Sequence, residues 1–414
     1  MLQRVRVRSP WWCAGLLAVA VILRLAWGFL TPNGLNLVDL HVYVEGSAAI
    51  LSGDLYEFTF ARYTPDFPLP FTYPPFAALV FLPLHHLPFV PLGIAWQLLT
   101  VAALFGVVRI AIELLVGRDE ARNRRWTSIA LVWTAIGVWS EPVRTTLDYG
   151  QVNVFLVLAV MVAVRSNRWW VSGGLVGLVA GIKLTPAITG LYFVARRRWG
   201  AAVFSAVVFG ATVAVSVWVL GEQGRLYFTS LLGDADRIGP VGSVWNQSLR
   251  GALSRIVGHD VGTGPVWVAA VLVCAALAVA AWRTLGADDR LGTLVIVQLF
   301  GLLVSPISWV HHWVWVIPML LWLVYGPPSR LRGARIVAGG WAALTAVGAV
   351  WLLSYAQPSI WDVGRPALFA WLGMANVAAA IAVYVWLIVS SRITGSVTDR
   401  PTRRSGERVR DPLP

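Results

Sequence analysis

The chain has 414 residues, of which 57% are hydrophobic and 13% charged, with a mean hydropathy of +0.69. A water-soluble domain carries about 25% charged residues, so this composition excludes a soluble protein and indicates an integral membrane protein. The net charge of +13 does not indicate nucleic-acid binding, because arginines gather at both chain ends and in short loops. That distribution is typical of cytoplasmic anchoring to anionic lipid.

Apolar runs of about 18 or more residues recur along the chain, each long enough to cross a bilayer as a helix. They predict an all-α, polytopic transmembrane bundle with about twelve spans, whereas a barrel would show short alternating segments. The expected spans are 11–30, 74–90, 92–116, 127–141, 150–165, 171–195, 199–220, 264–283, 292–308, 310–326, 334–353 and 366–389.

An even number of spans places both basic tails in the cytoplasm and the loops 31–73, 221–263 and 354–365 outside. The basic loop 117–125 then falls outside as well, against the usual charge bias. A lysine and a proline also interrupt 171–195. Re-entrant or broken helices are therefore an alternative between residues 74 and 200. We expect one membrane domain over 1–390 and a basic, disordered cytoplasmic tail over 391–414.

The first outer loop carries an acid, Asp39, nine residues after the first span ends at Leu30. A lone loop acid is usually a solvated charge. Here apolar residues flank Asp39, and 36–51 has the pattern of a short amphipathic helix at the membrane surface. The segment "PFTYPPF" (70–76) returns the chain to the membrane. A carboxylate in a half-dry pocket gains proton affinity, so Asp39 is suited to take a proton from a sugar hydroxyl.

Lys183, in "GIKLTP", lies in the middle of an apolar run. A buried lysine is costly unless it meets an anion or reaches the surface, so it is either a snorkelling residue or a cation for the phosphate of a lipid-linked donor. Pro186 is expected to break the helix there.

His311 and His312 occur in the apolar segment "SPISWVHHWVWVIP". They are either helix-packing histidines or residues of a polar cavity. Neighbours on an α-helix point about 100° apart, so only one is expected to face such a cavity. Zinc is disfavoured because no ligand follows at the third or fourth position.

Two polar islands, "TTLDYGQVN" (145–153) and "SVWNQSLRG" (243–251), offer amide and hydroxyl groups suited to sugar hydroxyls, although turn and cap residues look alike. No phosphate-binding loop, dinucleotide fingerprint or HExxH motif is present in the sequence, so an activated donor is expected to be lipid-linked. The candidate substrate-binding residues are Arg62, Tyr73, Arg144, Gln151, Asn153, Lys183, Asn246, Gln247 and Ser248.

Taken in order, "LVDLHVYVEG", "LYEF", "FTYPPFAALVFLPL", "GQVN", "GIKLTP", "WNQSL" and "SWVHHW" resemble the actinobacterial α-1,2-mannosyltransferases of the GT-C superfamily, over roughly residues 10 to 390. The resemblance implies a plasma-membrane enzyme with an extracytoplasmic active site. It implies transfer of mannose from polyprenyl-phosphate-mannose to the 2-hydroxyl of a mannosylated phosphatidylinositol, first of all the tetramannoside.

By this resemblance, Asp39 is the general base, Lys183 lies near the lipid phosphate, and His311 or His312 lies near the acceptor or the leaving phosphate. The family often carries paired acids in this loop, whereas "VDLHVY" has one. A divalent ion usually needs more than one carboxylate, so no metal or other cofactor is expected. Partners are the lipid donor, the glycolipid acceptor and membrane lipid, without nucleic acid.

Three alternatives stay open from the sequence. The acceptor can be lipomannan or lipoarabinomannan, because no residue identifies the mannolipid. The sugar can be arabinose, since the preference for mannose rests on resemblance. A lipid or sugar transporter would also line a membrane cavity with polar groups, but it predicts inverted repeats and polar sites near mid-bilayer.

Overall fold

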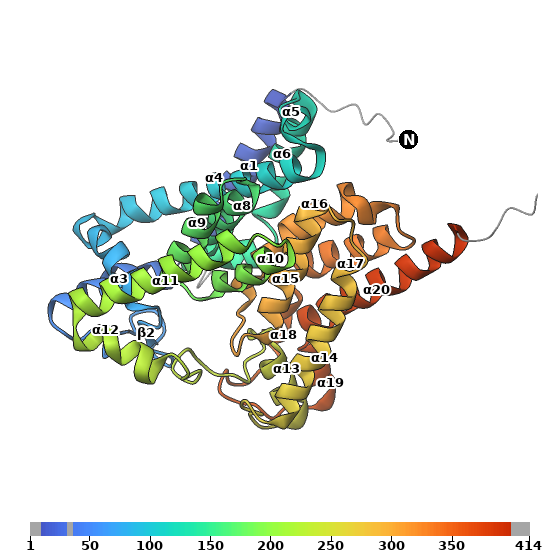
Figure 1. Cartoon of the computed structure of the whole chain (residues 1–414). Helices are drawn as coiled ribbons and strands as arrows, with labels where there is room; N and C mark the ends of the chain where they lie inside the picture. Colours follow the sequence, from blue (N-terminus) through green and yellow to red (C-terminus); the bar gives the residue numbers. More distant parts are fainter. Residues whose placement is uncertain (1–9, 31–35, 399–414) are drawn as a thin grey trace, which may run out of the picture.

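The computed structural model describes residues 10–30 and 36–398 and is built almost wholly of helices (Figure 1). Within that part of the chain, one short antiparallel ladder pairs β1 (Thr59–Phe60) with β2 (Leu69–Pro70). The prediction of an all-α fold is therefore confirmed. The N-terminal arginines and the last 16 residues of the predicted tail lie outside the described residues, and helix α20 continues into that tail as far as Thr398.

The N-terminal half contains the first span, the helical turns of the outer loop and the helices that carry Lys183. Its helices are α1 (Pro10–Leu30), α2 (Val38–His41), the π-helix η1 (Val42–Gly46), η2 (Ala49–Leu51), α3 (Pro75–Phe81), η3 (Leu82–His86), α4 (Phe89–Val116), α5 (Arg118–Ala121), α6 (Arg124–Gly137), α7 (Glu141–Tyr149), α8 (Asn153–Arg165), α9 (Trp169–Ile182), η4 (Thr185–Ile188) and α10 (Thr189–Ala195).

The C-terminal half supplies the histidine segment and the remaining outer loops. Its helices are α11 (Trp199–Leu220), α12 (Glu222–Leu226), η5 (Tyr227–Leu231), α13 (Leu249–Val257), α14 (Pro265–Trp282), α15 (Arg290–Val304), η6 (Val310–Trp315), α16 (Val316–Tyr325), η7 (Pro327–Arg330), α17 (Ala334–Val347), α18 (Ala349–Ser354), α19 (Ala367–Leu372) and α20 (Ala375–Thr398).

Five described helices are long and apolar enough to cross a bilayer: α1, α4, α11, α14 and the first part of α20. Only 17% of the apolar stretch is buried in α11 and in α14, so their outer faces are available to lipid tails. A polytopic membrane bundle is confirmed, but not the count of twelve crossings. The pair α7 and α8 becomes a sixth candidate if the two are taken as one broken span.

Several of the predicted spans are broken or have different boundaries in the structure, among them 334–353, divided at Gly348, and 366–389, divided between α19 and α20. The run 74–90 forms α3 and η3, which end at His86 and, at 12 residues, reach only about 18 Å. The run 171–195 breaks where α9 ends at Ile182. Lys183 is extended, with φ −149° and ψ 131°, and Pro186 begins a 3₁₀ turn, as expected from its ring and missing amide hydrogen.

Another broken region lies between α7 and α8, which meet at an angle of 119°. Gly150 takes the left-handed conformation that ends α7, with φ +70°. The polar island 145–153 therefore forms a corner rather than part of a straight span. Such breaks are tolerated in membrane proteins where the backbone lines a cavity or is buried in protein.

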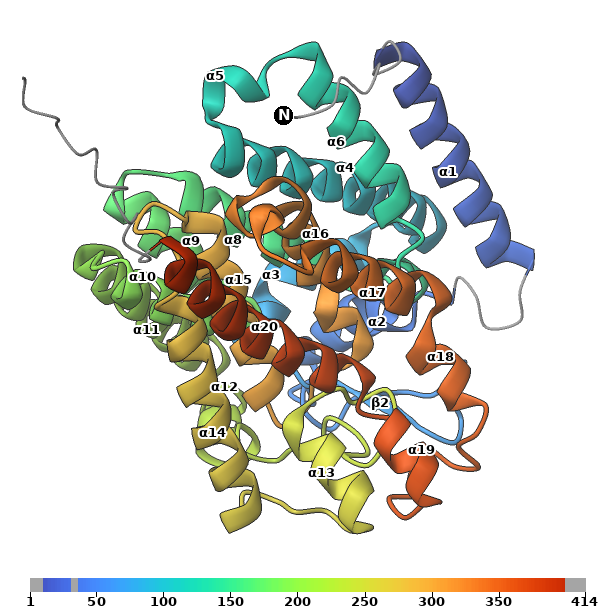
Figure 2. The same cartoon turned by 90° about the vertical axis from the view of Figure 1, so that its right-hand side faces the viewer.

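The arginine-rich connections lie together at one end of the bundle. Arg198 donates to the carbonyl of Ser166 at 2.9 Å, and Arg165 pairs with Glu113 at 3.3 Å. Arg196 donates to the carbonyl of Ala287, and Arg290 to that of Val164. Figure 2 shows α5 at the opposite end of the molecule from α13 and α19. These contacts define the basic end of the bundle, formed by 117–125, 165–168, 196–198 and 283–290.

The outer loop after α1 folds into the protein instead of lying flat on the membrane. Leu37, Leu40, His41 and Tyr43 are all buried, and within 36–51 only Leu51 is exposed. The amphipathic surface helix expected over 36–51 is therefore replaced by a packed α2–η1 segment. Its apolar residues cover the corner between α7 and α8 rather than lipid.

Candidate active site

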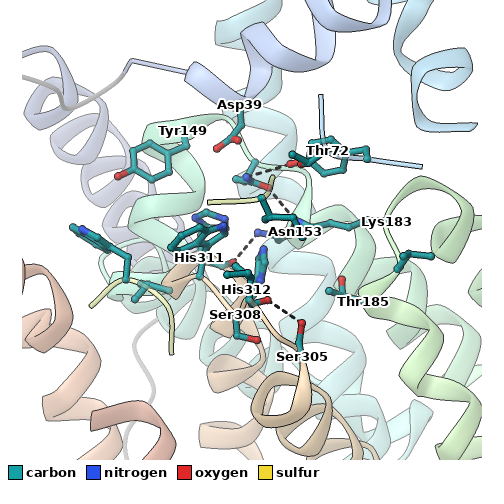
Figure 3. Close-up of a pocket in the computed structure, with 18 of the residues that line it drawn as sticks. Asp39, Thr72, Tyr149, Asn153, Lys183, Thr185, Ser305, Ser308, His311 and His312 are labelled. Carbon is teal, nitrogen blue, oxygen red and sulfur yellow. Dashed lines mark hydrogen bonds between the residues drawn. The ribbon is translucent and has the colours of Figure 1, made fainter. Parts of the chain in front are cut away.

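A cavity of about 760 Å³ opens among α2, the turn before α3, the α7–α8 corner, the break after α9, the loop before α13 and the η6 segment. Figure 3 shows Asp39, Tyr149, Asn153, Lys183, His311 and His312 around this space. Seven predicted site residues line it, and they come from segments far apart in the sequence: Asp39, Tyr73, Gln151, Asn153, Lys183, His311 and His312.

Asp39 lies in the first turn of α2 and is half-buried in the cavity wall. Burial raises the pKa of Asp39 from 3.8 to about 6, while the amide of Gln151 and the charge of Lys183 partly oppose the rise. The carboxylate is therefore a stronger proton acceptor than a solvated aspartate, yet is mostly ionised at neutral pH. This is the environment that a general base requires.

Lys183 is the only lysine in the sequence, among 33 basic residues. Its buried Nζ donates to Asn153 Oδ1 at 2.9 Å and to Gln151 Oε1 at 3.3 Å, and it lies 5.4 Å from the centre of the Tyr73 ring. These partners are neutral amides and an aromatic ring. Because no carboxylate hydrogen-bonds to the ammonium, its charge is offset only through space by Asp39 and remains available to an anion that enters the cavity.

A stripe of glycines explains why Lys183 reaches this position. Gly173, Gly177 and Gly181 lie on one face of α9, against α11. A Cβ atom on Gly177 would stand 2.5 Å from the carbonyl oxygen of Ser205. Small residues at this spacing allow two membrane helices to approach closely. This close packing fixes α9 against α11 and places Lys183, which follows the last turn of α9, in the cavity wall.

His311 and His312 both line the cavity, with ring centres 4.8 Å apart. The expectation that only one would face it is wrong, because the cavity borders nearly every residue from Ser305 to Trp315, so neighbours that point in different directions both reach it. Asn153 donates to the carbonyl of His311 at 2.8 Å and so fixes the backbone of this segment. Nε2 of His311 and Nδ1 of His312 are buried without a hydrogen-bond partner among the described residues.

A tyrosine pair fixes the amide of Gln151. Tyr43 donates to Gln151 Oε1 at 2.9 Å, and its hydroxyl lies 3.0 Å from that of Tyr73. Since Lys183 donates to the same oxygen, the Gln151 Nε2 group is left to face Asp39. Burial raises the pKa of Tyr73, so its hydroxyl stays protonated. The site thus contains a hydrogen-bonded frame around one acid and one cation.

The remaining predicted residues lie outside the cavity lining. Arg62 is exposed and lies over the Phe60 ring, and Arg144 lies over the Trp351 ring. Asn246, Gln247 and Ser248 are buried and hydrogen-bond to backbone. Asn246 and Ser248 both donate to the carbonyl of Pro306, so they brace the segment that leads into the histidines.

Several lining residues were not among the candidates. Tyr149 belongs to the polar island 145–153 and Ser308 to the apolar histidine segment 305–318, and both line the cavity (Figure 3). Asp234 and Arg237 lie in the outer loop after η5, where no spacing or motif marks them. Arg237 donates to the carbonyl of Tyr56, while its Nε has no partner among the described residues.

Among the described side chains of residues 10–30 and 36–393, no three or more His, Cys, Asp and Glu lie together in a group that could hold a metal ion. Asp39 and Asp234 are the acidic residues of the cavity lining. The expectation that the chain needs no metal stays a prediction.

The model of glycosyltransferase family 87 matches residues 71–306, more than half of the chain. The chain belongs to glycosyltransferase family 87. The matched region contains Tyr73, Gln151, Asn153 and Lys183, while Asp39 and the two histidines flank it. The cavity is therefore the candidate active site of a glycosyltransferase.

Curated relatives cover nearly the whole chain. A Mycolicibacterium smegmatis protein is 56% identical over 92% of each chain, and a Mycobacterium tuberculosis protein is 55% identical over 94% of this chain and 89% of its own. Both are named polyprenol-phosphate-mannose-dependent α-(1-2)-phosphatidylinositol pentamannoside mannosyltransferase.

A second M. tuberculosis protein is 32% identical over 95% of this chain and 94% of its own. It is named polyprenol-phosphate-mannose-dependent α-(1-2)-phosphatidylinositol mannoside mannosyltransferase. No solved structure matches the chain significantly. The recognition of an α-1,2-mannosyltransferase-like membrane protein from its motifs is confirmed.

Proposed function

We propose that this family 87 protein transfers mannose from polyprenyl-phosphate-mannose to the 2-hydroxyl of a phosphatidylinositol tetramannoside and so makes a pentamannoside. The identity of 55–56% to two enzymes named for the pentamannoside, against 32% to one named for phosphatidylinositol mannoside, favours this acceptor. The observation that carries the chemistry is the cavity in which Asp39, Lys183 and two histidines meet.

The proposed reaction is a single displacement. Asp39 removes the proton from the acceptor 2-hydroxyl as its oxygen attacks the anomeric carbon of mannose. The bond between that carbon and the phosphate oxygen breaks, and polyprenyl phosphate leaves with the electron pair. A β-linked donor then gives an α-linked product, so no enzyme nucleophile is required.

Lys183 is assigned to the departing phosphate, because it is the buried cation of the cavity and has only neutral hydrogen-bond partners. A fixed cation in a partly desolvated site stabilises charge that develops in the transition state. His311 and His312 each offer an unpaired ring nitrogen beside the cavity, for the phosphate or for a sugar hydroxyl.

The lining also separates by chemistry into two groups of residues. An apolar group from α8, η4 and α15 suits the polyprenyl chain and consists of Leu156, Val157, Val160, Ile188 and Leu302. A group from the outer loops and from the residue before η6 mixes aromatic and charged side chains, which suits a glycan, and contains Tyr63, Phe67, Asp234, Arg237 and Trp309. A lipid donor and a sugar acceptor need these two surfaces side by side.

We further propose that the basic end of the bundle faces the cytoplasm and the cavity faces outward at the plasma membrane. The basic loop 117–125 then lies inside, as the charge bias demands, because α3 and η3 are too short to cross. The break at Lys183 turns the chain back toward Arg196, which restores an even number of crossings. The number of crossings thus stays even and both tails stay in the cytoplasm, with altered span boundaries.

The test is an assay of the purified protein in lipid nanodiscs with polyprenyl-phosphate-mannose and a panel of phosphatidylinositol mannosides. We expect a single new α-1,2-linked mannose on the tetramannoside, by mass and linkage analysis, and none with Asp39→Asn. Transfer to a lipomannan alone, transfer of arabinose from polyprenyl-phosphate-arabinose, or movement of lipid without transfer would each overturn the proposal.

A further inference from the structure

Arg24 is a buried arginine in the middle of the apolar helix α1, with 2% of its surface exposed. A charge at this depth is costly and is rarely retained without a role. Its guanidinium pairs with Asp148 in the last turn of α7 and donates to the carbonyl of Arg144, one turn earlier, at 3.2 Å. One side chain thus attaches α1 to two successive turns of α7.

The end of α7 in turn holds the residues beside Asp39. The carbonyl of Asp148 accepts a hydrogen bond from the amide of Leu37 at 2.8 Å. Leu37 precedes α2 with φ +50° and ψ 33°, a left-handed conformation that a leucine rarely adopts. Such a conformation persists only where surrounding contacts hold it. Asp39 follows two residues later.

The same turn of α7 places two further cavity residues. Tyr149 follows Asp148 directly, and Gly150 packs so closely on Leu40 that a Cβ atom there would stand 2.7 Å from the Leu40 Cβ. Gln151 follows and forms the amide frame described above. The position of the Asp39 carboxylate therefore depends on where α7 ends.

We infer that Arg24 and Asp148 form a positioning pair, which holds Asp39 in its reactive place through the Leu37 amide. This inference rests on the proposed function. Neither side chain of the pair lines the cavity, so neither touches the substrate. Buried ion pairs contribute little net stability because desolvation offsets their attraction. Here the contacts of the pair instead join α1, the end of α7 and the backbone before Asp39. Geometry matters here because a shift of about 1 Å in a reacting group can cost a factor of about 10² in rate.

The test compares Arg24→Met, Arg24→Lys and Asp148→Asn with wild type. For each, kcat is calculated from the concentration of folded enzyme, and KM is measured for the donor and for the acceptor. We expect Arg24→Met to lower kcat by about 10- to 100-fold with KM values within about threefold. Arg24→Lys keeps the charge and is expected to recover part of the rate. Asp148→Asn keeps the backbone carbonyl and the shape, so its loss should be smaller than that of Arg24→Met.

The matched control is Arg165→Met, which removes the ion pair with Glu113 at the basic end of the bundle. It should leave kcat unchanged. Folded Arg24→Met with wild-type kcat would overturn the inference, as would failure of all three variants to fold, since that result assigns the pair to stability instead of geometry. A wild-type protein without transferase activity would refute the proposed function instead.

Discussion

Asp39 gives the sharpest prediction because its acid–base behaviour follows from its surroundings. Burial raises its pKa to about 6. The ionised fraction is then about nine-tenths at pH 7 and about one-tenth at pH 5, so kcat/KM should fall about tenfold between these values. An unperturbed carboxylate, with a pKa of 3.8, would stay mostly ionised over the whole range.

Asp39→Asn cannot accept the proton, and we expect it to lower kcat by a factor of about 10²–10⁴. The same change should raise the melting temperature at pH 7. The pKa of this carboxyl is higher in the folded than in the unfolded protein, so the free energy of unfolding decreases as the pH rises from the unfolded pKa to the folded pKa. At pH 7 this loss of stability is complete, and asparagine, which does not ionise, avoids it.

The assay measures initial rates between pH 5 and pH 8 in nanodiscs, with stability of the protein checked at each pH. His311→Gln and His312→Gln serve as controls, because an imidazole can also titrate in this range. The fall in rate on the acidic side of the pH profile, the acid limb, should persist in the residual activity of both variants. A flat wild-type profile, or a limb that disappears in either histidine variant, would refute the assignment of Asp39.

Other residues give shorter tests. Lys183→Met should lower kcat by about 10²–10³-fold, because the departing phosphate loses its cation. It should also move the acid limb to higher pH, because the charge of Lys183 lowers the pKa of Asp39. An acid limb at the wild-type pH would contradict the proximity of the two residues. Gly177→Leu should lower both the melting temperature and kcat, since its side chain would push α9 away from α11. Gly174→Leu, three positions earlier on the same helix, should be milder, because a Cβ atom there would stand 3.5 Å from its nearest neighbour. Asn246→Ala should lower the melting temperature by breaking the brace on Pro306 and leave the acid limb in place. Treatment with EDTA should leave the rate unchanged, and loss of activity restored by Mg²⁺ would disprove metal-free transfer.

The site residues that could be predicted from the sequence are those whose placement near lipid costs the most free energy. Asp39, Lys183 and the histidine pair stand out because an acid, a lysine or an imidazole is expensive near lipid. All four line one cavity. The break at Pro186 was also predictable, because proline acts on its own backbone and needs no distant partner.

The predictions failed where the position of a residue depends on contacts with residues far away in the sequence. Asn246 and Gln247 carry the same groups whether they bind a sugar or a carbonyl, and only their distant contacts with Pro306 and Gly373 decide between the two. Arg237 reaches the cavity from a loop without a motif. The length of α3 and the fold of 36–51 are likewise fixed by contacts with α7, α9 and α11 rather than by local hydrophobicity.

The single lysine has a practical consequence. Since Lys183 is the only side-chain amine and lies in the cavity wall, an amine-reactive probe carried by a donor analogue has one side chain to modify. One added mass per chain would then count occupied enzymes directly. Protection by unlabelled donor would convert this labelling into a binding curve, with no turnover needed.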